Sequence, residues 1–194
     1  MTRDSLRGKK VLALVSGGLD STTIVHWLAS AGVDVTGVTV DLGQPDEPDL
    51  SEVPPRMRAA GATDSVLVDG RERLAEYMMQ VIHGQAYHEG QYWNTTGIAR
   101  MATVAVVLPE VRALGIDVLT HGATGRGNDQ VRFELALAML EPNARVYAPW
   151  RDPEFEDSLG GRKLMIDYCR EHGLYTTATE EKPYSTDANF CGLT

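Results

Sequence analysis

The chain has 194 residues, of which 43% are hydrophobic and 23% are charged, and this composition predicts one ordinary globular domain. Its formal net charge of −9 argues against a protein that binds RNA or DNA through phosphates, because such a protein normally presents a basic face. The sequence has neither an apolar stretch of membrane-spanning length nor a signal peptide, and Cys169 and Cys191 form no CxxC pair or zinc spacing, so we expect a cytoplasmic protein with free thiols.

Apolar runs alternate along the chain with runs of helical period. The apolar runs predict strands at 9–15, 35–41, 65–68, 116–120 and 145–148. The helical runs predict helices at 21–31, 54–60, 73–82, 98–114, 129–140 and 162–172. The acidic runs at 46–49 and 152–157 and the glycine pair at 160–161 are expected in surface loops. This alternation predicts an α/β fold with a doubly wound, mostly parallel five-stranded sheet, whose ligands bind at the carboxyl ends of the strands.

The first predicted strand runs into a glycine-rich turn, Ser16-Gly17-Gly18-Leu19-Asp20-Ser21-Thr22, which leads into the first predicted helix. A strand, a tight turn and a helix start aim several backbone N–H groups at one point, and the helix dipole adds positive charge there. The glycines let a bulky anion approach the backbone, and the hydroxyls of Ser16, Ser21 and Thr22 can donate to it. The turn is neither a Walker P-loop nor a dinucleotide fingerprint. We therefore predict a phosphate site, with a plain hydroxyl-capped turn as the alternative.

A second string follows the fourth predicted strand and reads His121-Gly122-Ala123-Thr124-Gly125-Arg126-Gly127-Asn128-Asp129-Gln130-Val131-Arg132-Phe133-Glu134. Asn128 and Asp129 suit the start of the next helix, and Arg132, one turn later, faces the same way as Asn128. Thr124, Asn128 and Asp129 can together hold an amino acid, with Asp129 meeting its ammonium group. Arg132 can pair with a carboxylate, and Arg126 can neutralise phosphate charge. The alternative is a capped loop followed by a surface helix.

A polar, aromatic loop precedes the fourth predicted helix and spans Tyr87-His88-Glu89-Gly90-Gln91-Tyr92-Trp93-Asn94-Thr95-Thr96. Thr95 or Thr96 is expected to cap this helix, whose N-terminus can then hold a carboxylate beside Arg100. After the second strand, Asp41 can accept from a ribose hydroxyl, with a solvated turn residue as an equal alternative. His121 is expected to be a structural, hydrogen-bonded histidine.

These strings resemble those of a known family. S-G-G-x-D-S resembles the PP-loop of ATP pyrophosphatases, and H-G-A-T-G-R-G-N-D-Q-V-R-F-E is similar to the pattern H-G-A-T-G-K-G-N-D-Q-V-R-F-E of the argininosuccinate synthase family. The likeness covers nearly the whole chain and corresponds to that family's N-terminal nucleotide-binding domain. It implies a carbon–nitrogen ligase that uses ATP and Mg²⁺, the Mg²⁺ being carried by ATP and not by a metal site of the protein. In the family, ATP adenylates the ureido oxygen of citrulline, pyrophosphate leaves, and the amine of aspartate attacks the activated carbon.

The resemblance also implies site residues. Ten residues are expected to bind ATP. The phosphates are expected to contact Ala13, Ser16, Gly17, Gly18, Leu19, Asp20, Ser21 and Thr22, and the adenosine is expected near Val40 and Gly122. Aspartate is expected against Thr96, Thr124, Asn128 and Asp129, and a citrulline-like substrate against Tyr92, Asn128, Arg132 and Ser185. Catalysis is expected to depend on positioning and charge, supplied by Asp20, Arg126, Asn128 and Asp129.

The sequence departs from the family pattern in several places. The phosphate turn reads Asp20-Ser21-Thr22 where the family has Asp-Thr-Ser, Arg126 replaces a lysine, and Gly97 replaces a serine of the substrate carboxylate site. We expect the chain to lack the family's second domain and to consist of a nucleotide-binding domain at 1–181 and an extension at 182–194 that carries substrate-site residues. Either a partner chain or a homo-oligomer completes the site, or the carbonyl substrate is not citrulline.

Three functions are therefore weighed. The first is an ATP-dependent ligase that couples an amine, expected to be aspartate, to an adenylated ureido or carbonyl group. The second is a nucleotide-binding subunit of a split synthetase that has no activity alone. The third is a PP-loop enzyme that modifies tRNA, which the acidic charge and the lack of a CxxC pair disfavour.

Overall fold

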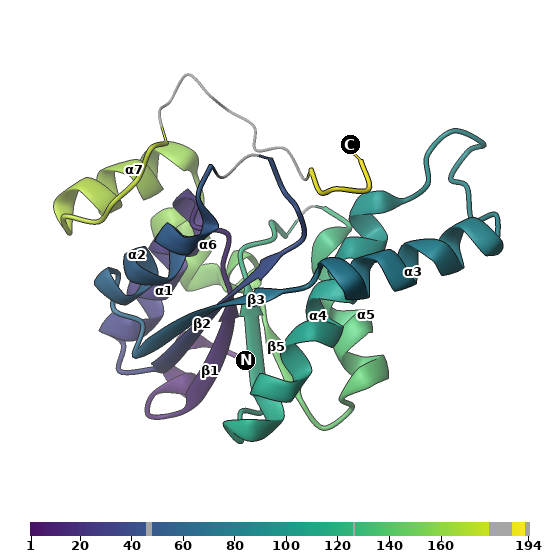
Figure 1. The fold of residues 1–194 in the computed structure, drawn as a ribbon. Coiled ribbons are helices and arrows are strands. Elements are labelled where there is room, and N and C mark those ends of the chain that lie inside the picture. The colour runs from purple at the N-terminus through teal and green to yellow at the C-terminus, as the bar shows by residue number, and fades with distance from the viewer. Residues whose placement is uncertain (46–47, 126, 179–187, 193–194) are drawn as a thin grey trace.

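The computed structural model describes residues 1–45, 48–125, 127–178 and 188–192, and in this part of the chain a parallel sheet lies between two layers of helices (Figure 1). The sheet is five-stranded with the order β3-β2-β1-β4-β5, its strands being β1 (Lys10–Leu14), β2 (Asp34–Asp41), β3 (Asp64–Asp69), β4 (Val118–His121) and β5 (Arg145–Tyr147). Every neighbouring pair runs parallel. The predicted doubly wound five-stranded sheet is confirmed, and the predicted strand ends differ from the observed ones by at most two residues.

Helices cover both faces of the sheet. One face carries α1 (Leu19–Ser30), α2 (Val53–Ala59), α6 (Pro153–Leu159) and α7 (Arg162–Glu171), and the other carries α3 (Arg71–His83), α4 (Thr95–Ala113) and α5 (Asp129–Leu140). Three short 3-10 helices complete the described elements: η1 (Arg3–Leu6), η2 (Leu50–Glu52) and η3 (Pro149–Arg151). Each helix layer buries one apolar core against the sheet.

The central strand β1 separates these two cores. Val11 and Ala13 pack into the core under α1 and α2, whereas Leu12 and Leu14 pack into the core under α4 and α5. Successive residues of a strand point to opposite faces, so a parallel strand that is buried on both faces reads as a continuous apolar run. That is why the sequence pattern of β1 could be recognised without knowledge of its neighbours.

The chain changes direction across the sheet at β1. Leu14, the last residue of β1, pairs with Val38 of β2 on one side and with His121 of β4 on the other. From β1 the chain proceeds through β2 to β3, and then returns to β4 and β5 on the opposite side. In doubly wound sheets a crevice forms where the strand order reverses, at the carboxyl ends of these central strands.

The acidic run at 152–157 is not the surface loop that the sequence predicted. Asp152 is 4% exposed, and its carboxylate accepts hydrogen bonds from Arg3 N (3.1 Å), Tyr147 Oη (2.7 Å) and Glu154 N (3.1 Å). Asp152 is the N-cap of α6, whose residues Phe155 and Leu159 are buried. The prediction was wrong because Glu154, Glu156 and Asp157 lie on the exposed face of a short helix, so the run reads as polar although the helix has two buried apolar residues.

No helix in the described parts of the chain is both apolar enough and long enough to cross a bilayer.

Candidate functional site

A cavity of about 660 Å³ opens at the carboxyl ends of β1, β2 and β4. Most of the predicted site residues line it, namely Ser16, Asp20, Ser21, Val40, Tyr92, Thr96, Arg100, Gly122, Thr124, Asn128, Asp129 and Arg132. The other predicted residues of the described chain are not among the lining residues: Ala13, Gly17, Gly18, Leu19 and Thr22. Arg126 and Ser185 lie outside the described residues. Three strings that are far apart in the sequence therefore meet around one cavity.

The backbone of the phosphate turn (residues 16–22) depends on its two glycines. Gly17 has a φ of +81°, a conformation that residues with a side chain rarely adopt. Gly18 stands at the N-cap of α1 and has no side chain to bond the amides of the first helical turn. No side-chain cap from the described residues therefore occupies the start of α1, which is the arrangement that an anion site requires.

The hydroxyls of the phosphate turn divide into two groups. Ser21 Oγ accepts from Ser16 N (2.9 Å) and lies 3.2 Å from Ser16 Oγ, and both side chains line the cavity. Thr22 Oγ1 instead donates to Gly18 O (3.1 Å), and Thr22 is 2% exposed. Two of the three hydroxyls expected near a phosphate therefore face the cavity, and the third braces the turn from behind.

Asp20 is a half-buried carboxyl group in the first turn of α1. Its Oδ1 accepts a hydrogen bond from Trp150 Nε1 (3.0 Å), 130 positions later in the chain. Burial raises the pKa of Asp20 above its ordinary value, and the hydrogen bond from Trp150 and the charge of Arg162 oppose this rise only in part. The sequence offered no signal that Trp150 would contact Asp20, because the contact joins two distant segments.

Asp129, the first residue of α5, stands between two guanidinium groups. Arg100 donates to Asp129 Oδ2 from Nε (3.1 Å) and Nη2 (2.7 Å), and Arg132 donates to Oδ1 from Nη1 (2.8 Å). Burial acts to raise the pKa of Asp129, but the hydrogen bonds and charges of the two arginines outweigh it and lower that pKa. We call these three residues the arginine–aspartate cluster. The sequence predicted that each would meet a substrate group, whereas in the structure they also meet one another, because α4 packs against α5.

The start of α4 is capped by a tyrosine and not by a threonine. The helix begins at Thr95 with Asn94 as the N-cap residue, and the hydroxyl of Tyr92 accepts from Thr96 N (2.8 Å). The prediction that Thr95 or Thr96 caps this helix was therefore wrong. A tight turn brings Tyr92 back over the helix, with His88 N donating to Tyr92 O (2.7 Å) and Tyr92 N donating to His88 O (3.1 Å).

The wall that follows β2 is apolar and contains Val38, Val40 and Leu42. Gln44, which the sequence analysis did not single out, also lines the cavity; its Oε1 accepts from Leu42 N (2.7 Å) and its Nε2 donates to Val40 O (3.0 Å). Asp41, considered for a ribose hydroxyl, accepts from Gly43 N (2.8 Å) and does not contribute to the cavity wall. The apolar surface suits the face of an adenine ring.

His121, at the end of β4, is 2% exposed and stacks on Phe133 with ring centroids 4.8 Å apart. Its Nδ1 accepts from Ala123 N (3.2 Å), so in the neutral ring Nε2 carries the proton. Burial, followed by the charge of Arg100, lowers the pKa of His121 to about 4. The predicted hydrogen bond of His121 is therefore present, while its Nε2 is buried without a partner among the described residues and the ring contributes to the cavity lining, so its purely structural role stays a prediction.

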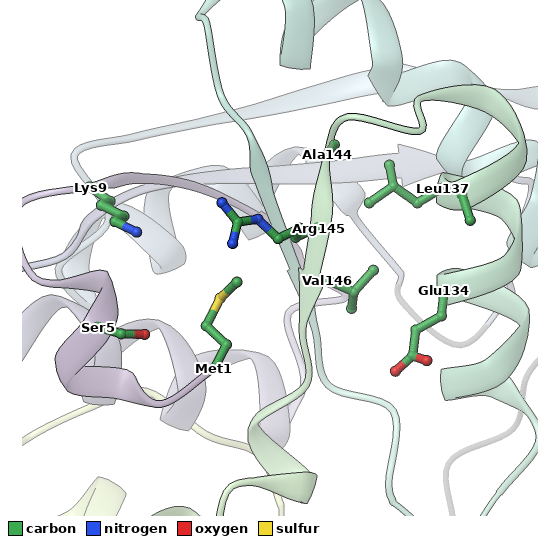
Figure 2. Close-up of a pocket in the computed structure, with 9 residues that line it drawn as sticks. Met1, Ser5, Lys9, Glu134, Leu137, Ala144, Arg145 and Val146 are labelled. Atoms are coloured by element: carbon green, nitrogen blue, oxygen red, sulfur yellow. The ribbon is translucent and has the colours of Figure 1, made fainter.

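A second hollow, of about 600 Å³, lies beside β5 at the open edge of the sheet (Figure 2). Its lining comes from the N-terminal segment, from α5 and from β5, and includes Met1, Ser5, Lys9, Glu134, Leu137, Arg145 and Val146. None of the described residues that were predicted to bind ATP or the amino-acid substrate lines this hollow. The candidate functional site is therefore the cavity at the carboxyl ends of the strands.

The fold and the cavity define an α/β protein of the PP-loop ATP pyrophosphatase type. Two solved structures resemble this fold at 16% sequence identity. One is a predicted subunit of a tRNA methyltransferase from Methanocaldococcus jannaschii, with a TM-score of 0.53 over 84% of this chain and 76% of that chain. The other is a 4-thiouridine synthetase in complex with RNA and bound ATP, with a TM-score of 0.54 over 87% of this chain and 42% of that chain. At this identity the likeness shows the fold alone.

The sequence comparisons identify the family. The family model described as the Arginosuccinate synthase N-terminal HUP domain matches residues 9–175. Argininosuccinate synthases from Rhodopirellula baltica, Aquifex aeolicus and Cronobacter sakazakii are 42%, 38% and 41% identical over 93%, 97% and 93% of this chain. The chain therefore belongs to the argininosuccinate synthase family. It spans 45%, 46% and 44% of the length of these three relatives.

Proposed function

We propose that this chain is the nucleotide-binding part of an ATP-dependent carbon–nitrogen ligase that converts ATP to AMP and pyrophosphate. The observation that carries the proposal is that the phosphate turn and the arginine–aspartate cluster line the same cavity. Membership of the argininosuccinate synthase family supports the same class of reaction. The amine substrate in this proposal is aspartate, and the adenylated oxygen belongs to a ureido or related carbonyl group.

The ATP phosphates are proposed to lie against the first turn of α1. The helix dipole and the hydroxyls of Ser16 and Ser21 favour negative charge there. Among the described residues no group of three or more histidine, cysteine or acidic side chains gathers to hold a metal by itself. Mg²⁺ commonly binds through substrate phosphates with one or two carboxylates. We therefore propose that Mg²⁺ enters on ATP, where Asp20 fits as a protein carboxylate.

The amino-acid substrate is proposed to bind over the arginine–aspartate cluster. The cluster has a formal charge of +1, because two guanidinium groups surround one carboxylate, and this charge suits a substrate carboxylate. Asp129 Oδ2 accepts two hydrogen bonds and Oδ1 accepts one. A carboxylate oxygen can accept two, so Oδ1 retains capacity for an ammonium or amine group. Thr124 and Asn128 line the same wall and supply further polar contacts.

The proposed reaction has two steps. The carbonyl oxygen of the substrate attacks the α-phosphorus of ATP, the bond to the bridging oxygen of the β-phosphate breaks, and pyrophosphate leaves. The amine of aspartate then forms the new carbon–nitrogen bond and loses a proton, while the carbon–oxygen bond to AMP breaks. His121 is neutral and buried, so we attribute the rate enhancement to positioning and charge instead of a histidine base.

A pyrophosphate-release assay tests this proposal. The purified chain is incubated with ATP, Mg²⁺, citrulline and aspartate, and we expect AMP release and repeated turnover to pyrophosphate only when aspartate is present. Asp129→Asn should lower the rate. The matched control, Asp167→Asn, removes an exposed carboxylate that pairs with Arg170 (2.9 Å) and should leave the rate unchanged. Release of ADP and orthophosphate would refute the ligase assignment.

A second candidate function is a nucleotide-binding subunit that is inactive until another polypeptide completes the site. The chain spans less than half the length of the relatives named above. In addition, Val131, Leu135 and Met139 are 57%, 58% and 62% exposed, and their spacing of four places them on one face of α5. The same helix carries Asp129 and Arg132, so a polypeptide docked on that face would lie beside the cavity. Calorimetric binding of ATP without turnover would support this candidate, and turnover by the purified chain alone would exclude it.

A further inference from the structure

The loop before α4 holds an asparagine in an uncommon backbone conformation. Among the described residues, the non-glycine residues with positive φ are Gln85 (+47°), Glu89 (+53°) and Asn94 (+55°), and all three belong to this loop. Such conformations cost free energy and persist where the surrounding structure imposes them. Asn94 is the residue at which the loop joins α4, and its side chain reaches two parts of the candidate site.

The first contact of Asn94 is with Gly97, in the first turn of α4. A Cβ atom placed on Gly97 would lie 2.4 Å from Asn94 Oδ1 and 2.8 Å from Asn94 Nδ2. These separations are far below the contact distance of non-bonded heavy atoms, so no residue with a side chain fits at position 97 while the amide stays in place. Glycine is otherwise a poor choice within a helix. The glycine therefore makes room for the asparagine.

The second contact of Asn94 is with Arg132. The oxygen that lies over Gly97 accepts a hydrogen bond from Arg132 Nη2 (3.3 Å), while Arg132 Nη1 donates to Asp129 Oδ1 (2.8 Å). The two terminal nitrogens of this guanidinium are thus held from two directions, by the loop before α4 and by the start of α5. Arg132 lines the cavity, whereas Asn94 is not among the lining residues. We therefore expect Asn94 to act on a ligand indirectly, through its contact with Arg132.

We propose that Asn94 and Gly97 form a positioning pair that orients Arg132 toward the carboxylate of the amino-acid substrate. Only the identity of that carboxylate rests on the proposed function; the contact among the three residues does not. An arginine has five N–H donors, of which Asp129 and Asn94 engage two, so a carboxylate in the cavity can still form a bidentate pair. Without Asn94 the guanidinium is held at one nitrogen only and can turn away. The expected consequence is weaker substrate binding with an unchanged chemical step.

Four proteins form a double-mutant cycle for this pair: wild type, Asn94→Gly, Gly97→Ala and the double variant. Glycine at position 94 keeps the positive φ without strain while it removes the amide. Alanine at position 97 adds the Cβ that displaces the amide. Asn94→Asp is the control for the geometry of Arg132, since it keeps both the acceptor oxygen and a side chain that tolerates positive φ; its added charge cancels the +1 charge of the cluster, so it is used only in the readout without substrate.

The first readout requires no substrate. The Nε–H resonance of Arg132 is followed in ¹⁵N-labelled protein and is assigned by its loss in Arg132→Lys. We expect a sharp signal in wild type and Asn94→Asp and a broadened one in Asn94→Gly and Gly97→Ala. Thermal unfolding provides an independent check: Gly97→Ala should lower the Tm when Asn94 is present and raise it in the Asn94→Gly background, where alanine meets no obstacle. An unchanged Arg132 signal, or additive shifts in Tm, would overturn the positioning pair.

The second readout is the steady-state kinetics of pyrophosphate release. Loss of one hydrogen bond to a charged group should raise the KM of the substrate whose carboxylate meets Arg132 about tenfold in Asn94→Gly and Gly97→Ala. The double variant should be no worse than either single variant, and kcat should stay within about twofold. Equal KM values across the cycle would overturn the proposal. If no variant and no wild-type protein releases pyrophosphate, the proposed function fails, while the resonance and the Tm values still decide the positioning pair.

Discussion

His121 should make the folded protein sensitive to mild acid, at pH values above those at which carboxylates titrate. Burial and the charge of Arg100 lower the pKa of this ring from 6.5 to about 4. The unfolded chain therefore binds a proton near pH 6.5, whereas the folded chain does so only near pH 4. Between these values the unfolded state binds more protons, so acidification favours unfolding. The contribution of neutral His121 is fully present above pH 6.5 and is lost progressively as the pH falls to about 4.

The size of this effect follows from the shift in pKa. One pKa unit corresponds to about 1.4 kcal/mol, and the pKa of His121 falls from 6.5 to about 4, so the free energy of unfolding should fall by about 3 kcal/mol across that range. The residue is 2% exposed, so solvent screening does not reduce this figure much. A loss of this size is a large fraction of the stability of an ordinary domain.

Urea unfolding between pH 8 and pH 4.5 measures this loss when wild type is compared with His121→Asn. Asparagine does not titrate, and its side-chain oxygen can take the place of Nδ1 as the acceptor for Ala123 N. Carboxylates such as Asp129 titrate in both proteins and cancel in the difference. We expect wild type to lose between about 2 and 3 kcal/mol relative to the variant on going from pH 7 to pH 4.5. A difference that stays constant with pH would refute the assignment of a buried, neutral histidine.

Three other substitutions test separate parts of the structure. Gly17→Ala forces a side chain into a φ of +81° and should weaken ATP binding measured by calorimetry. The control Gly8→Ala has a φ of +72° and a similar backbone strain of about 1–2 kcal/mol, but it does not line the cavity and should leave the affinity unchanged. Equal losses of affinity in the two variants would argue against the phosphate site. Tyr92→Phe removes the hydroxyl that accepts from the first turn of α4 and should lower the free energy of unfolding in urea by about 1 kcal/mol; no change would mean that this cap does not stabilise the helix. Asp152→Ala removes the acceptor of three hydrogen bonds and should lower the free energy of unfolding by about 3 kcal/mol in the same assay. The control Asp157→Ala changes an exposed residue and should lower it by almost nothing. Similar losses of stability in both variants would contradict the buried role of Asp152.

The strands and most helices could be predicted because their signals are local. In β1 the run Val11–Leu14 is buried on both faces and leaves a continuous apolar stretch in the sequence. The order of the strands has no such local signal, since it depends on which distant segments pair. The missed helix α6 had one usable indication, an Asp152-Pro153 pair that suits a helix start, but only Phe155 and Leu159 mark its apolar face.

The candidate site was predictable to the same degree. Thr124, Asn128, Asp129 and Arg132 fall within one string, and the proximity of Asn128, Asp129 and Arg132 follows from helical spacing. The partners of these residues do not follow from it. Arg100 lies 29 positions before Asp129, and the packing of α4 on α5 brings the two together. The same holds for the contacts of Asp20 with Trp150 and of Asn94 with Arg132, which link different elements.

A crystal structure of the chain with aspartate and the non-hydrolysable α,β-methylene analogue of ATP tests most directly whether one cavity serves both ligands. We expect the triphosphate against the backbone amides of residues 17–21 and the aspartate beside Asn128 and Asp129, within the cavity described above. A triphosphate bound in the hollow beside β5, or two ligands on separate faces of the molecule, would contradict the shared site.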